Sequence, residues 1–238
     1  MRLTDHLALF SPLDALAVAL TFGLWALLGW MIESERLSRP SVTILMQEFR
    51  RDWMREMITR QPRIFDAAIL SSLRQGTNFL ASASMISLGG LLALIGNSER
   101  LLGVAEDLTL GGSPTLVVEV KLMVTGIFLL YAFLKFVWSN RLFGYCAIMM
   151  AAVPNDESDP LALPRAVQSA ELNITAARSF NRGLRATYFA LAATAWLIGA
   201  APLIAATLVC VAVLWRREFA SQSRRILMQT PASAQPDL

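Results

Sequence analysis

The sequence predicts an all-α protein, a polytopic transmembrane helical bundle of four or five spans with an amphipathic interfacial helix on the cytoplasmic side. Of its 238 residues, 55% are hydrophobic and 16% are charged, whereas a soluble domain carries about 25% charged residues. The apolar residues form runs of about twenty, the length that crosses a bilayer core of ~30 Å. This composition excludes a disordered chain, a disulfide-stapled secreted module and a cytosolic enzyme of ordinary composition. We predict one membrane domain over residues 1–218.

The first three spans are predicted at residues 13–32, 69–95 and 116–138. The first run carries one charge, Asp14, and follows Pro12, a residue tolerated in the first turn of a helix. It is too long for the apolar region of a cleaved signal peptide. Residues 142–153 are too few to span a bilayer, so we expect a cytoplasmic extension or a buried segment there.

The last apolar region runs from Ala186 to Trp215. One straight helix of that length would measure about 45 Å, more than the bilayer core. Its centre holds Gly199 and Pro202, which can end one helix and start another. A kinked single span and a hairpin of two short spans both fit this pattern. We favour the hairpin, with spans at 184–199 and 202–217.

The lysines and arginines predict the orientation. Seven lie in segment 33–66, five in segment 139–185 and one in segment 97–118. The positive-inside rule therefore places the first two segments in the cytoplasm and the third outside. A final hairpin returns the four arginines after Trp215 to the cytoplasm. We expect a multi-pass protein of the bacterial cytoplasmic (inner) membrane, with its N-terminus outside and its C-terminus in the cytoplasm.

Two further helices are predicted on the cytoplasmic side. Residues 42–60 follow Ser41, a favourable N-cap, and place apolar residues on one side and arginines on the other. Such a helix suits the headgroup region, and a helix packed on its neighbours is the alternative. The second helix covers residues 163–181. The tail, residues 219–238, is expected to be disordered.

The side chains that many membrane enzymes need are scarce. The one histidine, His6, lies outside the spans, which excludes haem ligation by paired histidines and an H-E-x-x-H zinc site. Cys146 and Cys210 lie in apolar runs without a spacing typical of a metal site or disulfide framework. We therefore expect no enzymatic activity, no cofactor and no metal.

Polar residues gather near the predicted cytoplasmic ends of the spans. Ionisable side chains inside a membrane are costly and commonly face the bundle or water, which makes them candidates for a site. Arginine suits phosphate and carboxylate oxygens, so the cluster would bind an anion or a lipid headgroup. Snorkelling of the arginines to headgroups is the alternative interpretation. The candidate residues are Arg74, Gln75, Asn78, Trp138, Asn140, Asn181, Arg182 and Arg185.

Three stretches resemble the uncharacterised membrane-protein family called domain of unknown function 599. They are SLRQGTNFLASASMISLGG (72–90), VKLMVTGIFLLYAFLKFVWSNR (120–141) and FNRGLRATYFALAATAWLIGAAP (180–202). The third is the most specific, although Thr187–Tyr188 stands where two consecutive tyrosines are expected. The resemblance extends over about residues 15 to 220 and implies a multi-span membrane protein without implying an activity. It adds weight to Asn78, Trp138, Asn181, Gly183 and Arg185.

These observations favour an integral inner-membrane protein that acts as a non-enzymatic structural, interaction or accessory subunit. Its expected partners are the lipid bilayer, anionic lipid headgroups, and a homo-oligomer or larger membrane complex, without nucleic acid. The alternative is a small channel or transporter for an anionic or amphiphilic solute, which would use the polar cluster.

Overall fold

The predicted all-α class is confirmed. The computed structural model describes residues 9–97 and 115–229, and every regular element in these ranges is a helix. In chain order they are α2 (Pro12–Glu33), α3 (Val42–Thr59), α4 (Ile64–Gly96), α6 (Thr115–Ala151), α7 (Ala162–Thr194), the short 3₁₀ helix η1 (Ala195–Leu197), α8 (Ala200–Phe219) and α9 (Gln222–Leu227).

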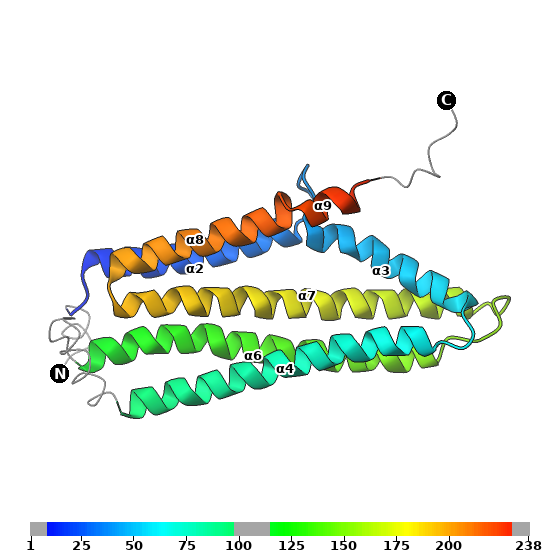
Figure 1. Ribbon diagram of the computed structural model, residues 1–238, viewed down its shortest axis with the longest axis horizontal. Helices are drawn as coiled ribbons and strands as arrows, with labels where there is room; N and C mark the ends of the chain where they lie inside the picture. The colour runs from blue at the N-terminus through cyan, green and yellow to red at the C-terminus, as the bar shows by residue number, and fades with distance from the viewer. Residues whose placement is uncertain (1–8, 98–114, 230–238) are drawn as a thin grey trace.

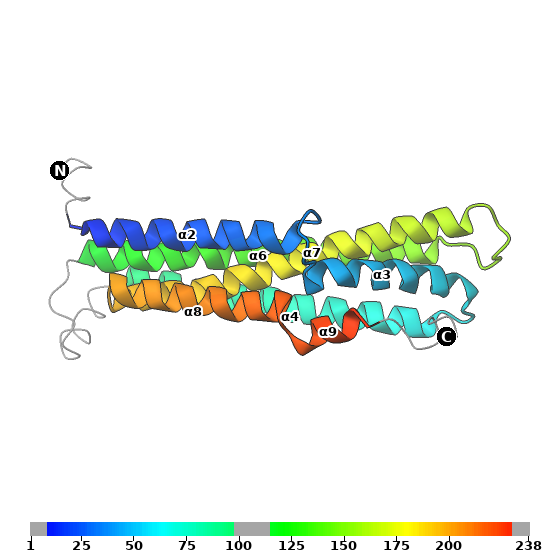
Figure 2. The ribbon, with the colours of Figure 1, turned by 90° about the horizontal axis from the view of Figure 1, so that it is seen from above.

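The helices form one elongated bundle (Figure 1). The 37 residues of α6 measure about 55 Å and the 33 residues of α7 about 50 Å. These two helices pack along one another, and α4 packs along α6. The pair α2 and α8 lies beside one half of the bundle, which we call the membrane half, and α3 lies beside the other, which we call the extension. Figure 2 shows α3 beginning near the end of α2 and continuing toward the opposite end of the bundle.

Helices in the membrane half have the length and composition of membrane spans. Four segments are long and apolar enough to cross a bilayer, namely α2, α4, α6 and Ala200–Leu227. The chain is therefore a multi-pass membrane protein. The more apolar second half of α7 lies among these helices (Figure 1).

The chain reverses direction between α7 and α8, at the break that the sequence predicts. Gly199 has φ 158° and ψ 173°, a conformation found almost only in glycine. The helix α8 then returns along α7 and α2. At this end Trp196 donates its indole N–H to Asp14, over 2.6 Å. Asp14 also accepts a hydrogen bond from the backbone N–H of Ser11, which caps α2.

One predicted boundary near the middle of the chain is wrong. The predicted cytoplasmic helix 163–181 and most of the predicted span 184–199 form one continuous helix, α7, which ends at Thr194. The reason is that hydropathy falls where a helix leaves the membrane, whereas the backbone hydrogen bonds continue. The single glycine at this point of α7, Gly183, fits against Phe136 rather than ending the helix. Residues 142–151, by contrast, extend the third span as one of the two expected alternatives has it, because α6 continues without a break to Ala151.

The predicted disorder of residues 219–238 is also wrong in its first part. The buried ring of Phe219 ends α8, and Ser221 caps α9 by accepting a hydrogen bond from the backbone N–H of Arg224. The Arg224 side chain donates to the carbonyl of Pro40 in the α2–α3 connection, over 2.9 Å. These contacts order the segment. Residues 230–238 lie outside the described residues.

The amphipathic helix predicted over residues 42–60 is α3, whose N-cap is Ser41, as expected. Its apolar side is buried against α6 and α7, in a cluster that includes Met54, Met57, Phe143 and Ala166. A helix whose apolar side is covered in this way cannot also lie on a membrane with that side. The structure thus has the alternative arrangement, in which α3 packs on its neighbours.

Candidate functional site

Seven of the eight predicted site residues lie in three separate places near the junction of the membrane half and the extension, and Trp138 lies in none of them. The first place is where α2 ends. The 22 residues of α2 measure about 33 Å, close to the ~30 Å of a bilayer core. Glu33, its last residue, therefore lies about one membrane thickness from the start of the helix. Two predicted residues of α7, Arg182 and Arg185, reach this level.

Glu33, Arg182 and Arg185 form a compact charged group. The Nε atom of Arg182 lies 3.0 Å from both carboxylate oxygens of Glu33, and its Nη2 atom lies 2.5 Å from Oε2. Arg185 donates to Oε1 of the same carboxylate. The Arg185 and Glu33 side chains are 8% and 15% exposed, while that of Arg182 is 40% exposed. One carboxylate thus balances two guanidinium groups, so the group carries a formal charge of +1.

A cavity of about 470 Å³ opens beside this group, between α2, α6 and α7, with Trp25, Trp30 and Tyr131 among its lining residues. The rings of Trp25 and Tyr131 meet edge to face at 5.1 Å, and the Lys135 ammonium lies 5.2 Å from the Tyr131 centroid. Aromatic rings beside cationic groups at this level are typical of a membrane–water boundary.

The second place is a groove of about 510 Å³ between α4 and the end of α6. Arg74, Gln75 and Asn78 are exposed side chains along it. The Nε atom of Arg74 lies 3.5 Å from Oδ1 of Asn140, a long hydrogen bond. Trp138, by contrast, is 47% exposed on α6 and lines neither this groove nor the cavity beside Glu33.

The third place holds Asn181, in a more enclosed cavity of about 230 Å³ between α3, α7 and α8. Asn181 donates its amide to the hydroxyl of Thr43, over 3.3 Å. The backbone N–H and the hydroxyl of Thr43 both donate to Oε2 of Glu218, each over 3.0 Å. The carboxylate of Glu218 therefore joins the end of α8 to the start of α3.

Arg50 and Arg178 also line the third cavity, and the sequence analysis singled out neither. Arg50 donates to the amide oxygen of Asn173. Burial lowers the pKa of Arg50, because the guanidinium loses water. A signal for Arg178 was present, since residues three and four apart share a helix face. Asn181 and Arg182 follow Arg178 at this spacing, so all three lie on one side of α7.

Other charged contacts hold the fold together. Asp66, which is fully buried at the start of α4, accepts hydrogen bonds from Trp53 and Arg60 of the α3 segment, over 2.7 Å and 2.5 Å. Arg63 donates to the carbonyls of Val153 and Pro154, over 2.7 Å each. Across residues 9–97 and 115–229, no three His, Cys, Asp or Glu side chains gather where they could hold a metal ion.

The family described as "Protein of unknown function, DUF599" matches residues 16–223, which include nearly all of the described helices. The chain belongs to this family. The resemblance carried by the three quoted stretches is thereby confirmed. No curated protein and no solved structure matches this DUF599 chain.

Proposed function

We propose that this DUF599 protein is a non-enzymatic interaction protein of the bacterial inner membrane, which assembles as a homo-oligomer through the outward side of α4. The proposal rests on the types of residue that lie on the outward side of α4 and on their spacing. Residues that favour close contact between membrane helices face outward there, at the spacing of a helix–helix seam.

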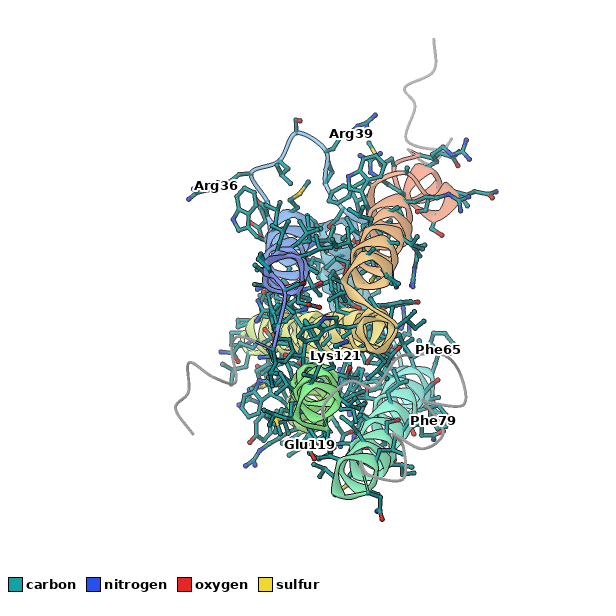
Figure 3. All side chains as sticks on the ribbon, turned by 90° about the vertical axis from the view of Figure 1, so that its left-hand side faces the viewer. Arg36, Arg39, Phe65, Phe79, Glu119 and Lys121 are labelled. Carbon is teal, nitrogen blue, oxygen red and sulfur yellow. The ribbon has the colours of Figure 1, made fainter. Side chains whose placement is uncertain are left out.

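The position of α4 leaves much of its surface uncovered. Within the bundle α4 packs mainly on α6, using buried residues at exact seven-residue intervals: Leu70, Thr77, Ser84 and Leu91. Figure 3 looks along the bundle from the end where α2 and α8 begin, and shows α4 at its edge. The labelled Phe79, on the outer side of α4, is 72% exposed.

A second seam runs along the uncovered side of α4. Its members are all exposed and recur at alternating intervals of three and four residues, the spacing of packed helices. We call it the α4 seam, and it comprises Gln75, Asn78, Ser82, Met85, Gly89, Leu92 and Gly96.

The chemistry of the α4 seam supports a protein partner rather than lipid alone. Small residues let membrane helices approach closely, and asparagine, glutamine and serine side chains form hydrogen bonds between such helices. A Cβ atom at Gly89 or Gly96 would meet nothing within 4 Å, so neither glycine is required by packing inside the monomer. Asn78 and Ser82 form no side-chain hydrogen bond with the described residues. A matching seam on a second copy would supply both contact and hydrogen bonds.

The charge distribution supports an orientation with the extension in the cytoplasm. The connection before α3, the helix α3 itself and the connection between α3 and α4 carry all seven arginines between Glu33 and Asp66. Short loops on the cytoplasmic side of a membrane carry an excess of lysine and arginine. The N-terminus would then lie outside, and α9 with the C-terminus would lie inside.

Cysteine crosslinking in native membranes tests the proposal. We expect Ser82→Cys and Gly89→Cys to form disulfide-linked dimers on mild oxidation, because each lies on the α4 seam. Val209→Cys, on α8, is the matched control. Val209 also lies on an apolar helix, and its side chain is 63% exposed. The two native thiols, Cys146 and Cys210, are buried, so the parent chain should remain monomeric on the gel.

The outcome that contradicts the proposal is a dimer yield at Ser82 and Gly89 no greater than at Val209. A second measurement uses no thiol chemistry. Gly89→Leu should shift the protein from dimer to monomer in mild detergent, as measured by light scattering. Gly23→Leu, at an exposed glycine of α2 with nothing within 4 Å, should leave the oligomeric state unchanged.

A further inference from the structure

We propose that the enclosed cavity between α3, α7 and α8 is a binding site for a phosphate group. We call it the arginine cavity, and its polar lining consists of Thr43, Gln47, Arg50, Arg178, Asn181, Arg217 and Glu218. The inference is independent of the α4 seam, which lies on another helix.

The lining has an excess of positive charge. Three arginines face one glutamate, which leaves a formal charge of +2. The carboxylate of Glu218 is itself engaged by the backbone N–H and hydroxyl of Thr43. Within the described chain no ion pair joins Glu218 to any of the three arginines. The counter-charge of the cavity is therefore incomplete.

Arg178 is the clearest sign of a missing partner. Its Nε atom is buried and has no hydrogen-bond acceptor. Nor does its guanidinium form an ion pair or ring contact with the residues that the structure describes. An unsatisfied buried donor costs about 1–3 kcal/mol, and more when it is charged. A bound anion would supply the acceptor that the protein does not.

Arg50 and Gln47 extend the donor set from the facing helix. Arg50 donates to the neutral Asn173 and has no acidic partner in the described ranges. Gln47 is buried, and no hydrogen bond of its side chain occurs within those ranges. Hydrogen-bond donors of α3 and α7 thus line the cavity from two sides. Few hydrogen-bond acceptors in its lining are left without a donor.

A phosphate group fits this arrangement in charge, shape and size. It is an acceptor with oxygens in several directions, and guanidinium groups bind it through parallel N–H donors. The volume of about 230 Å³ equals that of about eight water molecules at ~30 Å³ each, enough for a phosphate with a few waters but not for an acyl chain. Arg217 lies near the end of α8, so the phosphate could come from the cytosol or from a lipid headgroup.

Thermal unfolding of the full chain in uncharged, phosphate-free detergent tests the site. Sodium phosphate should raise the Tm saturably, whereas sodium chloride at equal ionic strength should not. Arg178→Gln should weaken the apparent affinity for phosphate about tenfold, the loss expected for one charge-assisted hydrogen bond. Arg55→Gln is the matched control, because Arg55 makes its ion pairs with Glu48 and Asp52 on the exposed side of α3. It should bind phosphate like the parent chain.

Two further arms make the result decisive. In nanodiscs of phosphatidylcholine with and without phosphatidylglycerol, a Tm increase that needs the anionic lipid identifies the headgroup as the source. An increase with inorganic phosphate in detergent alone identifies soluble phosphate. Arg217→Gln, at an exposed position of the lining, provides a second variant should Arg178→Gln fail to fold, and it should also bind more weakly. The proposal is overturned if neither phosphate nor phosphatidylglycerol raises the Tm. It is equally overturned if the cavity variants bind as the parent does.

Discussion

Gly183 sets the distance between the two central helices. A Cβ atom at this position would lie 2.7 Å from Cε1 of Phe136 and within 3.0 Å of two further atoms of that ring. The ring is fully buried and meets Phe180 at 5.6 Å, which leaves it little room to move. Glycine is thus required at position 183 for its size rather than for its backbone freedom.

Replacing this glycine should therefore destabilise the bundle. We expect Gly183→Ala to lower the free energy of unfolding by about 1–3 kcal/mol, the usual effect of overpacking a core. Gly144→Ala is the control, because a Cβ atom there meets nothing within 4 Å, and alanine favours a helix by about 1 kcal/mol over glycine. Thermal unfolding in one detergent should rank Gly144→Ala at or above the parent and Gly183→Ala well below it. Equal Tm values for the two variants would contradict this account.

At the scale of elements, α2 is attached to α7 by the carboxylate of Glu33. Removing one partner of a buried ion pair leaves the other charge without compensation. We expect Glu33→Gln to destabilise the protein by about 3 kcal/mol, the lower end of the usual range, because Arg182 is partly exposed. Glu35→Gln makes the same change of charge at an exposed position two residues away and should have little effect.

Chemical denaturation in detergent measures this difference. The double variant Glu33→Gln, Arg185→Gln should recover part of the stability, since Arg185 is the buried member of the pair. If Glu33→Gln and Glu35→Gln unfold at the same denaturant concentration, the carboxylate does not hold α2 to α7.

The sequence allowed most elements to be predicted, because the signals for them are local. Ser41 marks the start of α3, and Gly199 with Pro202 marks the reversal before α8. The continuity of α7 was missed for a physical reason. Hydropathy reports the expected medium around a helix, so it changes along α7 near Arg182, although the helix itself does not end.

The sequence indicates how far along the helices the candidate side chains lie, but not how they are arranged around the bundle. Charges such as Arg74 and Arg185 could be assigned to the same depth, because each lies near the end of an apolar run. Their angular positions around the bundle depend on how the helices pack, and the sequence holds no local signal for that. Arg182 and Arg185 were predicted together from their spacing on one helix. Their partner Glu33 comes from a helix about 150 residues away in the chain.

Along the long axis of the whole molecule the arginines are unevenly distributed, and many lie between Glu33 and Asp66. Fusions of a reporter after Gln229 and after Asn97 test the orientation proposed from this pattern. We expect cytoplasmic activity for the first fusion and external activity for the second, because an odd number of spans separates these points when α6, α7 and α8 all cross the membrane. The same compartment for both fusions would contradict the arrangement of the hairpin. Reversed signals would keep the hairpin but invert the orientation.

The unbroken course of α6 and α7 through both halves has a mechanical consequence. Both helices continue from the membrane half into the extension without a break, so a rigid tilt of one part carries the other with it. Over the 37 residues of α6, or about 55 Å, a tilt of about 5° at one end displaces the other by about 5 Å. Such a displacement would reach the far tip, where Arg63 holds the connection between α6 and α7.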